Sequence, residues 1–390
     1  MEGSRVTFVV VQQGETIDNL AERYDITVDE LTRLNEGVRD VDVGDVLKVI
    51  ERKPTFDKPR VRTHYVQGFY TGPMGVNMPG SQSAFERHAN LLTSLAPYWF
   101  DLDLRTPGKI KARATPTAIR SLVGDAHRRG VKILASIHNT DKPPSGVSRT
   151  EVLHSVLRAH RMAFINNIIG LVDEYGFDGV NLDFERLRDG DKALYTAFVC
   201  ELAQRLDAKG KTLNIDVLAD VRKEPYSLDF DFPGLAKCAD HLAMMTYDQY
   251  KASEPYPGPV AALPWVEDTL KQALNEGVPP EKILLGIPVY GYDWTVGQGN
   301  ARALSYDAVN RVRRQFNGVT KFHPTFKVPH MTYTDSQGRQ HEVWYEDARS
   351  LALKLDLVRK YNLAGVIIWR LGLEDPAAWG VIRAKLSPIA

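Results

Sequence analysis

The sequence predicts an α/β protein whose main part is a closed barrel of eight parallel strands with a helix after most strands. Three observations support this prediction. The chain has 390 residues, enough for a barrel of ~250 residues and a smaller domain. From about Arg62 onward, short apolar runs alternate with longer amphipathic segments. Strands that alternate with helical patterns indicate a parallel sheet, and eight such repeats indicate a (β/α)8 or TIM barrel.

The first fifty residues form a smaller pattern in the order strand, helix, helix, strand. Val6 to Val11 is an apolar strand, and apolar residues then follow at helical spacing from Ile17 to Tyr24. Thr27 and Glu30 have the spacing of a capping box, which predicts the start of a second helix. Residues 43–49 read as the closing strand. We therefore expect a βααβ module over residues 1–50, followed by a charged linker with two prolines over residues 51–61.

The barrel is expected to span residues 62–390. Its predicted strands are Val66–Tyr70, Pro97–Leu102, Val131–Ile137, Gly179–Phe184, Leu213–Leu218, His241–Tyr247, Ile283–Val289 and Gly365–Trp369. Its predicted helices include Thr117–Arg129, Glu151–Tyr175, Lys192–Leu206, Trp265–Glu276 and Ser350–Lys360. Surplus length between the seventh and eighth strands predicts a small α+β insertion at about residues 301–346. Within it, two strand-like runs flank Asp335-Ser-Gln-Gly and indicate a hairpin.

Composition excludes several classes of partner. Lys and Arg total 49, Asp and Glu total 49, and the formal net charge is +0, so no basic surface for nucleic acid is expected. No apolar run approaches the ~20 residues of a membrane-spanning helix. The N-terminus lacks the pattern of a signal peptide. Cys200 and Cys238 lie far apart without metal-site spacing, and we interpret both as buried small apolar residues outside any disulfide framework.

The fourth predicted strand contains the most informative pattern. In Phe177-Asp-Gly-Val-Asn-Leu-Asp-Phe-Glu185, the side chains of Asn181, Asp183 and Glu185 project to one face, and apolar side chains project to the other. Inside a barrel this polar face points into the lumen and approaches the carboxyl end, where barrel enzymes place their active sites. Buried carboxylates need partners or shifted pKa values, so this face predicts a catalytic site.

These residues resemble the family 18 glycoside hydrolases, whose fourth strand has the motif Asp-Gly-x-Asp-x-Asp-x-Glu. The sequence matches that motif at Asp178, Gly179, Asp183 and Glu185. Met245-Thr-Tyr-Asp248 after the sixth strand and Trp369 at the end of the eighth match two further positions of the family. Leu285-Gly-Ile-Pro-Val-Tyr-Gly291 resembles the family's seventh strand.

The resemblance implies retaining hydrolysis in which the 2-acetamido group of the substrate is the nucleophile, an exception to the usual two-carboxylate scheme. Glu185 is then the general acid and must keep its proton near neutral pH. Asp183 orients the acetamido group, and Tyr247 donates a hydrogen bond to its carbonyl oxygen. The supporting residues implied are Asn181, Asp178 and Asp248. The implied substrate-binding residues are Trp369, Met245, Tyr70, Tyr290 and Asn139, and no cofactor or metal is expected.

Asn181 departs from the family pattern, because many chitinases have an aspartate there that shares a proton with its neighbour. An amide can donate a hydrogen bond to Asp183 but cannot take up charge. We therefore expect Asp183 to remain more firmly ionised and the pH dependence to change.

Residues 1–50 resemble a LysM module, which binds peptidoglycan or chitin. The resemblance rests on Val10-Val-Gln-Gln-Gly-Glu-Thr16, Leu34-Asn35 and Val43-Gly-Asp-Val-Leu47. Apolar positions have a purely structural explanation, whereas Asn35 and the Gly-Asp turn are harder to explain that way. A tethered binding module raises the local concentration of an enzyme on an insoluble polymer.

Together the two regions resemble the spore cortex-lytic and germination glycosylases of endospore-forming bacteria. The expected substrate is peptidoglycan or another N-acetylglucosamine polymer, acted on by a monomer in the spore coat, cortex or cell wall. Two alternatives stay open: a chitinase with the same mechanism, and a non-catalytic glycan-binding coat protein.

Overall fold

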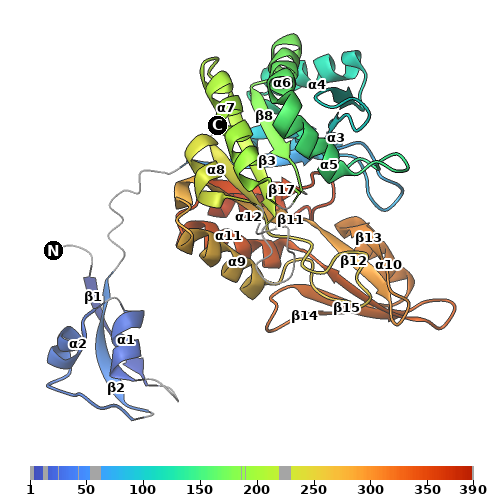
Figure 1. Ribbon diagram of the computed structural model, residues 1–390. Coiled ribbons are helices and arrows are strands. Elements are labelled where there is room, and N and C mark those ends of the chain that lie inside the picture. Colours follow the sequence, from blue (N-terminus) through green and yellow to red (C-terminus); the bar gives the residue numbers. More distant parts are fainter. Residues whose placement is uncertain are drawn as a thin grey trace. The chain divides into compact units, whose positions relative to one another are not determined.

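The computed structural model describes residues 4–11, 16–24, 26–42, 44–52, 63–185, 187–188, 190–218 and 230–388 (Figure 1). The chain divides into two compact units, residues 1–62 and 63–390. Each unit is described by itself.

The first unit has the expected strand, helix, helix, strand order. Its elements are β1 (Ser4–Val10), α1 (Ile17–Arg23), α2 (Val28–Leu34) and β2 (Val46–Arg52), and the two strands pair antiparallel. The capping box is confirmed, because the Thr27 side chain accepts from the Glu30 amide and Glu30 accepts from the Thr27 amide. Leu20, Leu31 and Val49 are fully buried in a small core of this unit. Most of the predicted linker, from residue 53 onward, lies outside the described residues.

The second unit confirms the predicted barrel. Eight parallel strands form a ring: β3 (Thr63–Tyr70), β4 (Ser94–Pro97), β7 (Lys132–His138), β8 (Gly179–Asp183), β9 (Thr212–Leu218), β10 (His241–Met245), β11 (Ile283–Pro288) and β17 (Gly365–Trp369). The ring closes where β17 pairs in parallel with β3. A short strand, β18 (Ser387–Pro388), also pairs with β3.

The second barrel strand differs from the prediction of Pro97–Leu102. The ring is formed by β4, which pairs with β3 and β7. Its residues Ser94-Leu-Ala-Pro97 are buried, but they are too few and too small to stand out as an apolar run. The predicted residues instead form β5 (Phe100–Leu102), which pairs with β7 and makes a hairpin with β6 (Ile110–Ala112) at the rim.

Helices surround the ring (Figure 1). They are α3 (Gln82–His88), α4 (Pro116–Arg128), α5 (Arg149–Ser155), α6 (Arg161–Tyr175), α7 (Lys192–Asp207), α8 (Phe232–Cys238), α9 (Leu263–Asn275), α11 (Ala348–Lys360) and α12 (Ala378–Lys385). The helix predicted over Glu151–Tyr175 consists of α5, a π-helical turn at Val156–His160, and α6. Apolar side chains of these helices pack on the outer faces of the strands in one large core.

The interpretation of the two cysteines is wrong. Cys200 on α7 and Cys238 at the end of α8 form a disulfide, with their Cα atoms 4.9 Å apart. Both residues are partly exposed rather than buried. The two cysteines are 38 positions apart in sequence with β9 between them, and the two helices that flank this strand pack against each other. The fold therefore brings together two cysteines whose spacing in sequence gives no sign of pairing.

The predicted insertion is a five-stranded antiparallel sheet with one helix. Its elements are β12 (Tyr290–Thr295), β13 (Ala301–Ser305), α10 (Tyr306–Gln315), β14 (Val319–Phe322), β15 (Pro329–Thr334) and β16 (Gln340–Tyr345). The insertion begins at β12, earlier than the expected residue 301. The expected hairpin is present as β15 and β16.

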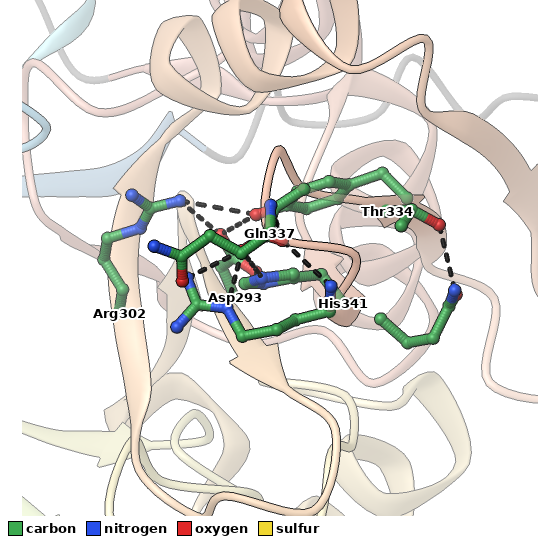
Figure 2. A network of polar contacts seen from close by, with 9 residues as sticks. Asp293, Arg302, Thr334, Gln337 and His341 are labelled. Carbon is green, nitrogen blue, oxygen red and sulfur yellow. Dashed lines mark hydrogen bonds and ion pairs between the residues drawn. The ribbon is translucent and has the colours of Figure 1, made fainter.

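A buried polar cluster fixes the strands of this insertion. The Asp293 carboxyl group accepts hydrogen bonds from Arg302 (2.5 Å) and Tyr333 (2.8 Å), and it contacts His341 Nδ1 (2.9 Å). Figure 2 shows Asp293 of β12, Arg302 of β13 and His341 of β16 close together. His341 also contacts Asp335 in the hairpin turn, so the cluster joins the turn to the sheet.

Candidate active site

The motif strand β8 places its polar residues at the carboxyl end of the barrel. Gly179 at its start has a structural explanation, because a Cβ atom there would lie 2.1 Å from the Thr212 carbonyl oxygen of β9. Asp178 lies at the opposite, amino end. Its carboxylate accepts from the Ile133 amide (2.9 Å) and contacts His127 (2.9 Å). The fold therefore uses Asp178 to join strands and separates it from Asp183 and Glu185.

A layer of polar side chains crosses the barrel lumen below Asp183 and Glu185. The Gln67 amide donates to Asn181 Oδ1 (2.7 Å), and Asn214 donates to Gln67 Oε1 (2.8 Å). Ser94 donates to the same Gln67 oxygen (3.1 Å), and all four of these residues are fully buried. The bond from Gln67 fixes the orientation of the Asn181 amide, whose nitrogen then faces β9.

Asp216 on β9 is a buried carboxyl group that the sequence analysis missed. Asn181 Nδ2 donates to Asp216 Oδ2 at 2.6 Å, and Asp216 is fully buried. Asn181 and Asn214 are register partners on the neighbouring strands β8 and β9, so Asp183 and Asp216 each lie two residues further toward the same end. The signal was present in Leu213-Asn-Ile-Asp-Val217, which alternates in the same way as the motif strand.

Asp183 does not have the firm ionisation expected from the sequence. It is 3% exposed, and burial together with the nearby charges of Glu185 and Asp216 raises its pKa well above the usual value. Burial likewise raises the pKa of Asp216, and the charge of Glu185 adds to this effect. The expectation considered only Asn181, whose amide donates to Asp216, and did not include a third carboxyl group. One oxygen of each aspartate has no hydrogen-bond partner among the described residues.

Glu185 follows the end of β8 and is held through its backbone. Its amide donates to Asn139 Oδ1 at 3.1 Å, and Asn139 lies directly after β7, 2% exposed. The structure thus gives Asn139 a positioning contact with the predicted acid. Tyr98 lies beside Asp183, because a hydrogen bond from its side chain lowers the pKa of the Asp183 carboxyl group. The Tyr98 hydroxyl also forms a hydrogen bond with Thr140 (2.7 Å).

Tyr247 and Asp248 follow β10, which is separated from β8 only by β9. Burial raises the pKa of Tyr247 well above its usual value, and the charges of Asp216 and Asp183 add to this effect. Tyr247 therefore keeps its phenolic proton at neutral pH and is available as a hydrogen-bond donor. The Asp248 carboxyl group accepts from the hydroxyls of Tyr290 and Tyr292, which fixes the segment after β10 against the insertion. Met245, at the end of β10, is buried.

Two predicted aromatic residues end their strands at the same rim. Trp369, at the end of β17, is partly exposed and packs edge to face against Phe69 (4.9 Å between ring centroids) and Tyr98 (5.2 Å). Tyr70, at the end of β3, packs against Trp99 and donates to Gln82 (2.5 Å). Trp369 thus lies in the aromatic group around Tyr98, while the hydroxyl of Tyr70 is directed to α3.

The described residues contain neither a metal-binding cluster nor a membrane-spanning helix. Within the described ranges, His, Cys, Asp and Glu side chains nowhere gather in a group of three or more that could hold a metal ion. Among the same residues, each helix is too short or too polar to span a lipid bilayer.

Asn35 in the first unit has a structural role that the sequence analysis did not foresee. Its side-chain amide donates to the carbonyl oxygens of Leu31 and Lys48 (both 2.8 Å) and accepts from the Lys48 amide (2.7 Å). These bonds connect α2 to β2. Gly44 adopts a φ of 99°, which favours glycine. Both features follow from folding alone, so neither is evidence for a glycan contact.

Comparison with known proteins gives a consistent family assignment. Residues 87–374 match the profile of Glycosyl hydrolases family 18, and residues 9–49 match that of the LysM domain. YdhD of Bacillus subtilis (strain 168), named as a sporulation-specific glycosylase, is 35% identical over 260 residues, covering 65% of this chain and 60% of the relative. A cortical fragment-lytic enzyme of Bacillus anthracis is 27% identical over 300 residues, covering 75% of this chain and 67% of the relative.

A solved structure agrees with this assignment. The crystal structure of a chitinase from Chromobacterium violaceum ATCC 12472 superposes with a TM-score of 0.75 and 28% identity, over 84% of this chain and 100% of that one. The family profile covers most of the chain and includes β8, β9 and β10 with the buried carboxyl groups. The chain belongs to glycosyl hydrolases family 18 and has a LysM domain before its barrel.

Proposed function

We propose that the protein hydrolyses the glycosidic bond beside N-acetylglucosamine in peptidoglycan, with retention of configuration. The observation that supports this most directly is the convergence of Asp183, Glu185 and Tyr247 at the carboxyl end of one barrel, with Asp183 buried and one of its oxygens without a partner among the described residues. A buried carboxyl oxygen of this kind is suited to receive a polar group of the substrate.

In the proposed reaction, Glu185 donates its proton to the glycosidic oxygen while the 2-acetamido carbonyl oxygen attacks the anomeric carbon. The C–O bond to the leaving group breaks, and an oxazolinium ion forms. Asp183 accepts the acetamido N–H and stabilises the positive charge, and the Tyr247 hydroxyl donates to the acetamido oxygen. Glu185 then removes a proton from water, which attacks the anomeric carbon. This attack opens the oxazolinium ring and restores the 2-acetamido group.

The names of two relatives favour peptidoglycan as the polymer: a sporulation-specific glycosylase of Bacillus subtilis and a cortical fragment-lytic enzyme of Bacillus anthracis. The LysM match adds a glycan-binding module that suits either polymer. We propose that the module holds the enzyme on the cell wall or spore cortex. Chitin is the second candidate, because the superposed structure from Chromobacterium violaceum is a chitinase.

Mass spectrometry of the products from purified spore cortex and from chitin oligomers tests the proposal. We expect fragments from cortex that end in N-acetylglucosamine at the new reducing end. Glu185→Gln is the matched control, because the amide keeps the shape but cannot transfer a proton, and a loss of ~10²-fold or more is expected. Turnover of chitin alone would assign the second candidate, and no turnover of either polymer would reject hydrolysis.

The chemistry has its own test. A thiazoline analogue of N-acetylglucosamine resembles the proposed intermediate and should inhibit competitively. Tyr247→Phe should weaken this inhibition by about 1 kcal/mol, the scale of one hydrogen bond. A covalent glycosyl-enzyme on any carboxylate, or products of inverted configuration, would contradict the proposed mechanism.

A further inference from the structure

A polar cavity lies at the same end of the barrel as the catalytic residues. It has a volume of about 330 Å³, and its charged lining residues are Asp103, Arg105, Lys111, Asp141 and Lys142. Two segments form it: the turn between β5 and β6, and the loop that follows β7. Asp101 of β5 pairs with His138 of β7, and His138 pairs with Asp183 of β8, so these segments leave the sheet at the carboxyl end.

The loop after β7 belongs to the cavity and to the active site at once. Asn139 accepts the Glu185 amide (3.1 Å), and Thr140 hydrogen-bonds Tyr98 (2.7 Å), which lies beside Asp183. The next two residues, Asp141 and Lys142, line the cavity. The loop that positions Glu185 therefore also supplies two residues of the cavity lining.

The charges of the lining leave an excess of positive charge. Asp141 is paired with Lys111 (2.9 Å), and this contact lowers the pKa of Asp141, so the pair is neutral overall. The Asp103 carboxylate accepts the backbone amide of Arg105 (2.9 Å). The side chains of Arg105 and Lys142 are exposed, and neither has an ion-pair or hydrogen-bond partner among the described residues. Apart from the Lys111–Asp141 pair, the cavity is thus lined by two cations, Arg105 and Lys142, and one carboxylate, Asp103. The formal net charge of the whole chain is +0.

A neighbouring ion pair connects the cavity to the active site. Arg113 donates to both oxygens of Asp101 (2.5 and 2.7 Å) and lies 3.8 Å from Asp141. Its guanidinium also lies over the Tyr98 ring, 5.8 Å from the centroid. The Arg113–Asp101 pair is neutral overall, so it connects the cavity to Tyr98 without adding net charge. Guanidinium and ammonium groups are the side chains that bind carboxylates.

We propose that this cavity binds a carboxylate carried by the glycan substrate. The inference rests on the proposed function and names the substrate class more narrowly. Two sources present this chemistry in peptidoglycan, namely the lactyl acid of a muramic residue and the terminal carboxyl group of a short peptide attached to it. Chitin has no carboxylate, so the cavity gives the enzyme a preference for peptidoglycan.

The test compares acidic and neutral tetrasaccharides as substrates of the full chain. The acidic substrates contain muramic acid with a free lactyl group, or with a single alanine attached. The neutral substrates are chitotetraose and a tetrasaccharide in which the muramic residue is a lactam. For Arg105→Gln combined with Lys142→Gln, we expect kcat/KM to fall roughly tenfold on the acidic substrates and to stay within twofold on the neutral ones. Lys142→Glu should lower kcat/KM on the acidic substrates further, because a negative side chain repels the carboxylate of the substrate.

Lys109→Gln is the matched control, since Lys109 is exposed in the same turn and does not line the cavity. The acidic substrate that loses more turnover identifies the source of the carboxylate. Equal effects on acidic and neutral substrates, or an equal effect of the control, would overturn the inference. If the wild-type chain turns over no tetrasaccharide, the proposed hydrolysis fails. Equilibrium binding of the same acidic and neutral tetrasaccharides to the same variants then decides the inference separately.

Discussion

Three carboxyl groups, those of Asp183, Asp216 and Glu185, lie together at the carboxyl end of the barrel. Like charges in a buried site oppose one another's ionisation, and Asp183 and Asp216 both have raised pKa values. The Asn181 amide donates to Asp216, so this carboxyl group occupies a fixed position beside the motif strand. The protonation of the site is therefore a property of the group rather than of one residue.

Replacing Asp216 by Asn should move the acidic limb of the pH–rate profile. Without that neighbouring carboxyl group, Asp183 ionises more easily, so the limb of kcat/KM should shift to lower pH by about one unit or more. Combining Asn181→Asp with Asp216→Asn places a carboxyl group on β8 in place of the one removed from β9. The acidic limb of this double variant should shift back toward the pH of the wild-type limb. A pH–rate profile of Asp216→Asn that matches the wild type would show that Asp216 does not influence Asp183.

The same variant should be more stable than the wild type at neutral pH. The pKa of Asp216 is raised by folding, so its contribution to stability is complete below its unfolded pKa of ~3.9 and is lost as the pH rises toward the folded value. Asp216→Asn removes this loss and should raise the free energy of unfolding at pH 7. One pKa unit corresponds to about 1.4 kcal/mol. Calorimetry should show a gain in Tm at pH 7 that vanishes near pH 4. The exposed Asp207→Asn is the control, and a gain independent of pH would contradict the prediction.

At the scale of elements, the disulfide joins two helices that precede and follow β9, the strand of Asp216. In the chain-entropy model, closing a loop of 38 residues stabilises the fold by about 4 kcal/mol. Replacing Cys200 and Cys238 together by Ala should therefore lower the free energy of unfolding by roughly 2–4 kcal/mol, measured by denaturant titration. Adding a reductant to the wild type should have a similar effect and should leave the variant unchanged. A variant as stable as the wild type would show that the bond adds nothing.

The elements that could be predicted from sequence are those with their own local signal. Six of the barrel strands showed as apolar runs, and β8 showed its alternation of Asn181, Asp183 and Glu185 with apolar residues. β4 could not be found, because its short, small-residue segment acquires its burial only from β3 and β7. The disulfide could not be predicted for a similar reason, since it depends on the packing of α7 against α8.

The site could be predicted where one strand contains the whole pattern. Asp216 could not be placed, because its partner Asn181 lies on a different strand and the contact depends on the register between β8 and β9. Asn35 was misinterpreted for a related reason. Its bonds to Lys48 join residues 13 apart, and nothing local in the sequence shows that the amide is already engaged.

At the scale of the whole molecule, the LysM unit and the barrel have separate cores. Removing residues 1–62 should leave the hydrolysis of short soluble oligosaccharides unchanged, because the barrel strands and the site lie in residues 63–390. Action on intact cell wall should fall, since a tethered binder raises the effective concentration on the polymer. Pelleting with insoluble wall measures the module's contribution. An equal loss on soluble and insoluble substrates would instead assign the module to the catalytic unit.

The closure of the barrel between β17 and β3 also sets when the enzyme becomes active during its synthesis. β17 pairs with both β11 and β3, and it ends in Trp369. A ribosome adds ~5–20 residues per second, so the chain contains Glu185 on the order of ten seconds or more before it contains β17. Until then, β3 and β11 lack a shared neighbour and the rim lacks its tryptophan. A nascent chain that already holds the proposed acid Glu185 thus lacks a closed barrel, and we expect hydrolysis to begin only after β17 has been synthesised.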